Sequence, residues 1–298
     1  VKERKDWCIS RQRKWGVPIP IFFCKECGEA HIDNDAMMAV ADLFEKEGSN
    51  AWYSHTAAEI LPEGTKCKKC GCTEFEKEKD IMDVWFDSGS SHAAVISKRD
   101  NLKFPADLYL EGNDQYRGWF QSSLLTSVAT EGVAPYKAVL THGMILDEEK
   151  RKMSKSLGNG ISPQDVTEKY GADVLRLWVS STDYQSDVHI SNEILKQISE
   201  SYRKIRNTAR YILGNVYDFN PDTDSVPVNE LMPMDKWAIV KLNELIAKVK
   251  QAYDNYEFHQ VYHSIRNFCV IDMSNFYLDV LKDRLYTEKS DSKSRKAA

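Results

Sequence analysis

Two copies of one cysteine pattern could hold a metal ion. Cys-x-x-Cys-Gly occurs at Cys24 and Cys27 and again at Cys67 and Cys70. A two-residue spacer lets both thiolates of a pair face one ion, and the glycine that follows can adopt the positive φ of a tight turn. Four sulfurs complete the tetrahedral shell that Zn²⁺ accepts without redox chemistry. The spacing therefore predicts a structural zinc site.

Other roles for the cysteines stay open at this point. Cys72 lies just beyond the second pair and could replace one of the four ligands, and His31 and His55 are weaker alternatives. Ordinary reduced thiols are the alternative without a metal. Cys8 and Cys269 are interpreted as small buried apolar side chains.

A short basic loop could act on phosphates. Residues 150–159 read KRKMSKSLGN. Lysine is a compact charge on a flexible stem, so a mobile loop with Lys152 and Lys155 could close over a triphosphate and neutralise the charge that builds on a departing pyrophosphate. A basic loop that is merely solvated is the alternative.

The surrounding segments predict an α/β fold followed by helices. From Asp80 onward, β-prone runs (IMDVWF, ADLYLEG, KAVLTHG) alternate with apolar-periodic segments, which is typical of a doubly wound parallel sheet. Ser162 and Pro163 predict a helix start, and a second short helix should follow Gly171. Beyond Ser191, an apolar stripe at spacings of three and four predicts packed helices; it comprises Leu195, Ile198, Tyr202, Ile205, Ala209 and Ile212. Further helices are expected over 236–254 and 258–285, after a loop over 220–233.

Composition narrows the class of protein. Hydrophobic residues make up 42% and charged residues 29% of 298 residues, which is typical of a folded chain. We find no apolar run of about 18 residues and no signal peptide, so we expect a cytoplasmic protein without a membrane segment. The net charge of −5 argues against a surface that coats polyanions, so any contact with nucleic acid should be local. Seven cysteines without an export signal favour metal or reduced thiols over disulfides.

Several motifs together resemble the class I aminoacyl-tRNA synthetases. KMSKS at Lys152–Ser156 is similar to a signature of that family, and WCISRQRKWGVPIP from Trp7 resembles its isoleucyl, valyl and leucyl subgroup. Three runs are similar to the isoleucyl enzymes in particular: DVWFDSGSSH from Asp83, YLEGNDQYRGWFQSSL from Tyr109 and RLWVSSTDY from Arg176. The resemblance extends from about Asp6 to at least Arg210, with the motifs in the family's order.

The resemblance implies a fold with four parts. These are a re-entry segment of the catalytic domain over 1–23, a cysteine-rich, zinc-ribbon-like insertion over 24–80, the second half of a doubly wound, Rossmann-like catalytic domain over 81–190, and part of an all-α anticodon-binding bundle over 191–298. In an open parallel sheet, ligands bind at the carboxyl edge of the strands.

The resemblance also implies roles for particular residues. The residues expected to contact the adenylate and the ammonium of isoleucine are Glu111, Gly112, Asp114 and Gln115, and the walls of the side-chain pocket are expected at Trp85 and Trp119. His142 and Gly143 are expected beside adenosine, with the backbone of Met144 and Ile145 reading adenine. The expected catalytic residues are Lys155 and Lys152. Ordinary core packing for the tryptophans, a helix cap for Asp114 and a satisfied polar group for His142 are the alternatives.

The implied substrates are L-isoleucine, ATP with Mg²⁺, and tRNA(Ile), and we expect a monomer. Five basic residues after Ser191 could touch tRNA phosphates, although a solvated helix face is favoured for each one; they are Lys196, Arg203, Lys204, Arg206 and Arg210. The family's first signature, His-Ile-Gly-His, and its editing site do not occur in this sequence. We therefore expect that these 298 residues alone do not activate isoleucine.

Two rival interpretations remain. One is a valyl- or leucyl-tRNA synthetase, against which the Trp-Phe-Asp-Ser-Gly run and the Arg-Leu-Trp-Val-Ser-Ser run argue. The other is a noncatalytic zinc-ribbon and helical module that only binds RNA. Such a module has no reason to carry both the Glu-Gly-Asn-Asp-Gln turn and the lysine loop.

Overall fold

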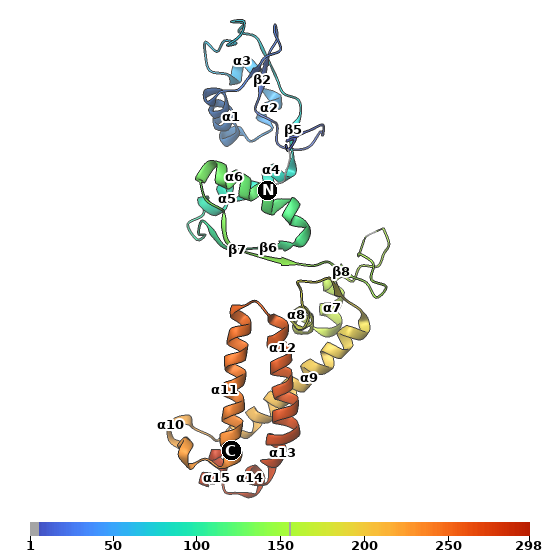
Figure 1. Ribbon diagram of the computed structural model, residues 1–298, viewed down its shortest axis with the longest axis vertical. Coiled ribbons are helices and arrows are strands. Elements are labelled where there is room, and N and C mark those ends of the chain that lie inside the picture. Colours follow the sequence, from blue (N-terminus) through green and yellow to red (C-terminus); the bar gives the residue numbers. More distant parts are fainter. Residues whose placement is uncertain (1–5, 155) are drawn as a thin grey trace. The chain divides into compact units, whose positions relative to one another are not determined.

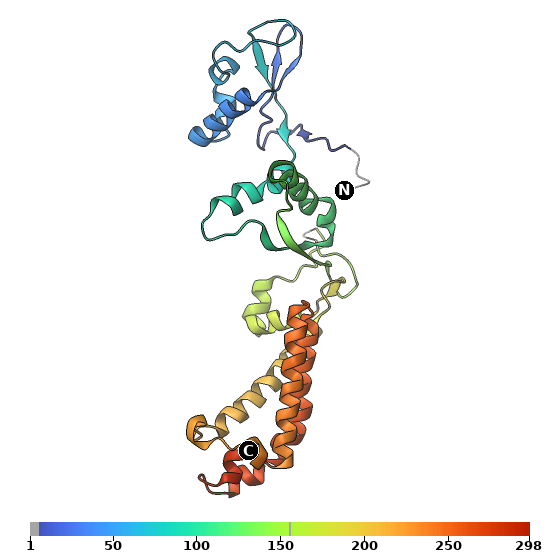
Figure 2. The same cartoon turned by 60° about the vertical axis from the view of Figure 1, so that its left-hand side comes forward.

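The structure is a computed structural model that describes residues 6–154 and 156–298 (Figures 1 and 2). The chain divides into two compact units, one up to Thr141 and one from His142 on, and each is described by itself. Among the described residues, no helix is both long and apolar enough to cross a bilayer.

The cysteine-bearing part of the first unit is a small antiparallel sheet with helices. Strands β2 (Phe22–Cys24), β3 (Ala30–His31) and β4 (Phe75–Lys77) pair in the order β3-β2-β4. Between the two cysteine pairs lie α1 (Asn34–Glu47), α2 (Ala51–Ser54) and α3 (Ala57–Ile60). The predicted ribbon therefore carries three helices as well. Local chemistry explains two of the starts, because Asp33 caps α1 and Thr56 forms a capping box with Glu59.

These helices and strands share one core. Phe22 and Trp52 are almost fully buried and their rings pack 5.2 Å apart, with Phe75 in the same cluster. Packing of this module therefore begins at Phe22. The limits of the four predicted segments stay a prediction.

A short ladder joins the start of the described chain to the segment after the module. Strand β1 (Ser10–Arg11) pairs antiparallel with β5 (Ile81–Met82). The buried carboxylate of Asp83 accepts a hydrogen bond from Trp7 Nε1 at 3.2 Å and forms an ion pair with Arg11. Two of the motifs quoted above, around Trp7 and after Asp83, therefore pack together.

The rest of the first unit contains a β-α-β crossover. Strand β6 (Ala106–Gly112) leads through α6 (Trp119–Glu131) to β7 (Tyr136–His142). The Ala106 N–H donates to the Pro135 carbonyl at 2.9 Å, so both strands start at the same end and run parallel. Short helices complete this layer: α4 (Val84–Gly89), α5 (Ser91–Ala94) and the 3₁₀ helices Ile96–Lys98 and Asn113–Arg117. In Figure 1, α5 and α6 lie on one side of the two strands.

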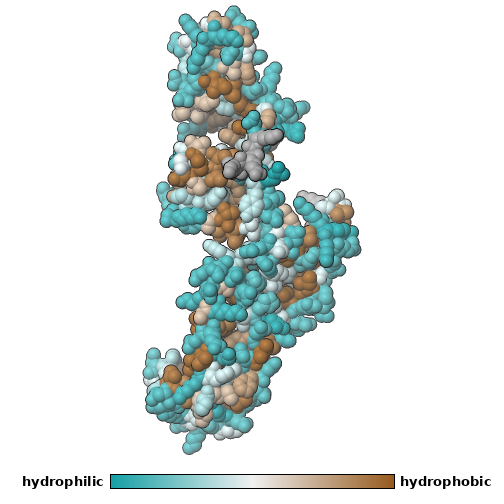
Figure 3. Space-filling model, viewed as in Figure 1, coloured by the Kyte–Doolittle hydropathy of each residue, from teal (hydrophilic) through white to brown (hydrophobic). Residues whose placement is uncertain are grey.

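The contact between α4 and α6 is close because its residues are small. Gly89 of α4 faces Ser122 of α6, where an added Cβ would stand 2.8 Å from the serine Oγ. Ser122, Ser123 and Ser127 are buried on α6, and Ser123 bonds to the Tyr109 hydroxyl at 3.1 Å. Apolar residues nevertheless remain exposed on this part of the chain, as Figure 3 shows; Leu110, Val128 and Val139 are among them.

The second unit opens with another parallel pair. Strands β8 (Ile145–Leu146) and β9 (Val188–His189) pair parallel, and α7 (Pro163–Tyr170) and α8 (Ala172–Ser181) lie between them in sequence. Ser162 caps α7, since its Oγ accepts from the Gln164 N–H at 3.2 Å. Both predicted helix starts are confirmed, and the parallel pairs confirm the α/β class.

The helices that follow form the predicted all-α part. They are α9 (Asn192–Asn215), α10 (Pro221–Asp224), the 3₁₀ helix Val228–Glu230, α11 (Pro233–Asp254), α12 (Phe258–Asn267), a π-helix over Phe268–Tyr277, α13 (Leu278–Val280), α14 (Lys282–Thr287) and α15 (Lys293–Ala297). Figures 1 and 2 both show α11 and α12 side by side. The buried Asp235 of α11 forms a two-bond ion pair with Arg284 and accepts from the Tyr277 hydroxyl at 2.9 Å. This network ties α11 to the last helices.

Candidate functional site

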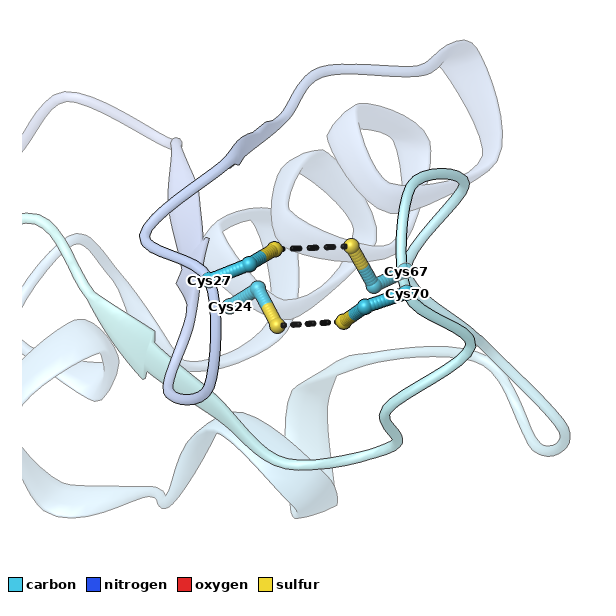
Figure 4. Close-up of side chains that lie close together, drawn as sticks. All are labelled: Cys24, Cys27, Cys67 and Cys70. Carbon is cyan, nitrogen blue, oxygen red and sulfur yellow. Dashed lines mark hydrogen bonds between the residues drawn. The ribbon is translucent and has the colours of Figure 1, made fainter.

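The four predicted cysteines lie together and fit a tetrahedral metal ion. Their sulfur atoms are all within 4.8 Å of one another. Figure 4 shows Cys24 and Cys27 on one loop facing Cys67 and Cys70 on another, with Sγ–Sγ distances of 3.5 Å between Cys24 and Cys70 and 3.6 Å between Cys27 and Cys67. Four thiolates at about 2.3 Å from a central Zn²⁺ would stand about 3.8 Å apart. The cluster therefore has the dimensions of such a site.

Backbone hydrogen bonds favour the thiolate form of two of the four cysteines, whereas the pKa values of Cys27 and Cys70 are raised, with burial among the causes. A hydrogen bond from the Cys27 backbone N–H is the main cause that lowers the pKa of Cys24 to about 6. The corresponding bond from the Cys70 backbone lowers the pKa of Cys67. Gly28 and Gly71 have φ of 67° and 77°, the left-handed turn conformation that the sequence predicts for them. Cys72 lies outside the four-sulfur cluster, and its thiol contacts the Glu74 backbone instead.

The acidic turn lies where β6 ends. Glu111 is exposed and Gly112 is buried, and Asp114 and Gln115 follow in the 3₁₀ helix. Among residues 6–154 and 156–298, the Glu111 carboxylate has no hydrogen bond or ion pair, so it is free to accept a ligand's ammonium group. The turn thus presents an unpaired carboxylate at the carboxyl end of a parallel strand.

Gln115 has a structural task that sequence reasoning missed. Its Oε1 accepts from the Trp119 backbone N–H at 3.0 Å, so the side chain caps the start of α6. Its Nε2 donates to Asp114 Oδ2 at 3.3 Å. The cap is needed because Gly118, before α6, offers no side chain of its own.

The two tryptophans lie near this turn. Trp119 stacks on Tyr109, with ring centroids 4.2 Å apart, and its Nε1 donates to the Ser88 carbonyl at 3.0 Å. Trp85 is 40% exposed, and its Cη2 would be 3.5 Å from a Cβ placed on Gly118. Trp119 is therefore fixed on both sides, whereas Trp85 offers an open ring face.

His142 and Gly143 begin the second unit. The Gly143 N–H donates to the Tyr184 carbonyl at 2.8 Å, and an added Cβ would lie 2.4 Å from Ser186, so only glycine fits there. The His142 ring contacts the Gly143 carbonyl through Nδ1 at 2.8 Å. The Met144 N–H donates to Asp187 Oδ1 at 2.7 Å, and its carbonyl accepts from Val188. In this structure the Asp187 side chain and β9 bind both backbone groups of Met144, and the reading of adenine by the backbone of Met144 and Ile145 stays a prediction.

The lysine loop has an ordered base. Lys152 is exposed and forms an isolated antiparallel bridge with Leu146 at the end of β8. Lys155, the other predicted catalytic lysine, lies outside the described residues. Asp147 and Asn159, which sequence reasoning missed, hydrogen-bond at 2.8 Å across the base of the loop. The sequence marks each of them separately, Asp147 as an acidic residue directly after a strand and Asn159 as the end of a Leu-Gly-Asn turn after the basic run, but it does not indicate that they meet.

A family comparison decides what the motifs mean. Residues 1–191 match the family described as tRNA synthetases class I (I, L, M and V). The chain belongs to this family of class I tRNA synthetases. Residues 235–298 match a second family, described as the anticodon-binding domain of tRNA ligase.

Relatives among the class I synthetases are close in sequence. The chain is 63% identical over all its 298 residues to an isoleucine–tRNA ligase of Caldanaerobacter subterraneus subsp. tengcongensis, and 62% identical to one of Caldicellulosiruptor saccharolyticus. In both cases it covers 32% of the relative, so it spans about a third of the length of the curated relatives it matches.

Solved class I structures share the fold. A leucyl-tRNA synthetase of Agrobacterium radiobacter K84, in a ternary complex, superposes with a TM-score of 0.65 at 21% identity over 98% of this chain and 38% of the other. A methionyl-tRNA synthetase of Mycobacterium tuberculosis superposes with a TM-score of 0.58 at 22% identity over 73% of this chain and 44% of the other. These likenesses support the mixed α/β architecture with its helical C-terminal part.

Proposed function

We propose that this chain is a segment of an isoleucyl-tRNA synthetase. In the full-length protein, it would help to join L-isoleucine to ATP as isoleucyl-adenylate and to pass the acyl group to tRNA(Ile). The observation that carries the proposal is the 63% identity to an isoleucine–tRNA ligase along the whole chain. The free Glu111 carboxylate, the tryptophans and the KMSKS loop supply the chemistry that this reaction needs.

Each proposed role follows from the chemistry of the side chain. Glu111 and Asp114 would bind the isoleucine ammonium by charge-assisted hydrogen bonds, and Gly112 would let the adenylate approach the backbone. The donor side of Gln115, its Nε2, would contact the adenylate while Oε1 keeps the cap on α6. Trp85 and Trp119 would contact the apolar side chain of isoleucine. The ring of His142 and the backbone of Gly143 would border the adenosine.

The lysine loop would stabilise charge on the leaving group. When the isoleucine carboxylate attacks the α-phosphorus of ATP, negative charge builds on the departing pyrophosphate. Lys155 and Lys152 would neutralise it, together with the Mg²⁺ that accompanies ATP. No covalent bond between enzyme and substrate is needed, because positioning and charge stabilisation carry such reactions.

The remaining parts would support the enzyme. Zn²⁺ would be held by Cys24, Cys27, Cys67 and Cys70 and would stabilise the module around them, since a closed four-thiolate shell has no position for substrate. The helical part after Ser191 would contact tRNA(Ile), with Lys196, Arg203, Lys204, Arg206 and Arg210 as candidates for phosphate contacts. We propose that the full-length protein is a cytoplasmic monomer.

Amino-acid-dependent exchange of pyrophosphate into ATP by the full-length protein tests the proposal. Isoleucine should support exchange best and valine less well, because a pocket gains only modestly from one methylene. Leucine should support little exchange, since its branch point differs. Exchange that prefers valine or leucine would favour the rival members of the same subgroup. No exchange with any amino acid would contradict the proposal.

A further inference from the structure

At the base of the lysine loop, the Asp147 carboxylate accepts hydrogen bonds on both of its oxygen atoms. Asp147 is 8% exposed. Its Oδ1 accepts from the backbone N–H groups of Glu149 at 3.0 Å and Arg151 at 2.8 Å. Its Oδ2 accepts from Arg151 Nε at 3.0 Å and from Asn159 Nδ2 at 2.8 Å. Four donors from three residues thus converge on one side chain.

Asn159, at the other end of the loop, bonds both to Asp147 and to the loop backbone. Asn159 Oδ1 accepts from the Ser154 N–H at 2.9 Å, while Nδ2 is held by Asp147. One amide side chain therefore joins the strand end before the lysines to the backbone between them. Asn159 is half-buried, and its bonds to Asp147 and Ser154 are partly shielded from water.

The backbone between Asp147 and Lys152 forms a tight hairpin. The Asp147 N–H donates to the Arg151 carbonyl at 3.0 Å, and the Lys150 N–H donates to the Asp147 carbonyl at 3.1 Å. Lys150 has φ of 63°, and the bridge between Leu146 and Lys152 follows directly. Lys152 therefore leaves this turn in a defined direction, set by the bonds to the Asp147 side chain.

These hydrogen bonds also explain the charge state of the Asp147 carboxylate. The Asn159 side chain and the Arg151 backbone and guanidinium hold the pKa of Asp147 well below its ordinary value. A carboxylate with a lowered pKa contributes stability above its ordinary pKa near 4, so the Asp147 carboxylate is ionised and keeps its hydrogen bonds at neutral pH.

We infer that Asp147 and Asn159 are positioning residues: they clasp the two ends of the lysine loop and so orient Lys152 toward the pyrophosphate. The inference rests on the proposed function, in which that lysine acts on ATP. Neither residue touches substrate in this scheme; both act through Lys152. A loop with open ends would still bind ATP, but its charges would be displaced in the transition state.

A double-mutant cycle in the full-length protein tests the inference. Asn159→Ala removes both clasp bonds of the amide and is expected to lower kcat for isoleucine-dependent exchange roughly 10- to 100-fold, as for a displaced catalytic group, and no more than Lys152→Ala does. The KM for isoleucine should stay within about twofold, since the acidic turn is not altered. In a Lys152→Ala background, the same change should cost less than about threefold, because the lysine that the clasp positions is already gone. Equal losses in both backgrounds would overturn the inference, because a purely structural role is additive.

Two further variants and one independent measurement sharpen the test. Asp147→Asn replaces one acceptor oxygen by an NH₂ group that faces the same hydrogen-bond donors, so it should reproduce the loss. Glu149→Gln is the control: it removes only the exposed Glu149–Arg151 ion pair and should change kcat less than about twofold. Trypsin should cut after Lys150 or Lys152 about tenfold faster in Asn159→Ala than in the parent, as expected for loss of local order. If the parent shows no exchange, the proposed function fails. The trypsin experiment still tests the clasp in that case, because equal cleavage rates in Asn159→Ala and in the parent would overturn it.

Discussion

Replacing Lys155 by alanine in the full-length protein should lower isoleucine-dependent pyrophosphate exchange by roughly 100- to 1000-fold, the usual cost of losing one group that stabilises transition-state charge. Most of the loss should appear in kcat, because the charge that Lys155 is proposed to neutralise develops during the reaction. Lys152→Ala should show a smaller loss of the same kind. The measurement is steady-state exchange at varied ATP and at varied isoleucine.

Lys150→Asn is the matched control for this prediction. Lys150 lies in the same basic run but outside the KMSKS motif, and asparagine tolerates its positive φ. The substitution removes one charge from the loop but none of the proposed catalytic contacts. The exchange rate should therefore stay within about threefold of the parent's, because an exposed charge has a weak effect. Similar losses for Lys150→Asn and Lys155→Ala would contradict a specific role and favour a general effect of charge.

Replacing Cys24 by serine should remove the metal from the module. We expect one zinc per chain in the parent and close to none in Cys24→Ser, measured by elemental analysis of protein purified without chelators. Because binding of structural zinc contributes on the order of 10 kcal/mol to folding, the sheet β3-β2-β4 should lose its order with the metal. Rapid amide exchange over residues 22–77 would report that loss.

Cys72→Ser is the control, since Cys72 is next to the cluster but is not one of the four grouped sulfurs. It should keep its zinc and its protection from amide exchange. Loss of zinc from Cys72→Ser with retention in Cys24→Ser would show that the ligand set is wrong. Parent protein without zinc would contradict the site itself.

Local patterns predicted the features that local chemistry determines. Ser162 and Pro163 carry a complete helix start in adjacent residues, and the structure begins α7 there. The two Cys-x-x-Cys-Gly repeats predicted both the four-sulfur cluster and its positive-φ glycines, because the turn and the ligands lie within five residues. The apolar stripe after Ser191 likewise predicted α9, since its period is a property of one helix.

Features set by tertiary contacts were harder to predict. Nothing local indicates that Gln115 will cap α6, that Asp187 will engage the Met144 N–H, or that Asp147 will meet Asn159 twelve residues away. Each of these polar side chains could equally have faced water, and only the packed fold brings donor and acceptor together. The helices between the cysteine pairs were missed for a related reason, because their short apolar faces are completed by Phe22 and Phe75 from the sheet.

Amide exchange of the full-length protein with and without isoleucyl-sulfamoyl adenosine, a nonreactive analogue of the adenylate, tests the proposed function most directly. Under the proposed function, the turn after β6 and the segment over 142–159 each contact the adenylate. We predict slower exchange over 111–119 and over 142–159 when the analogue binds, with residues 24–77 unaffected. Binding that protects neither segment, or protects only one of them, would contradict the claim.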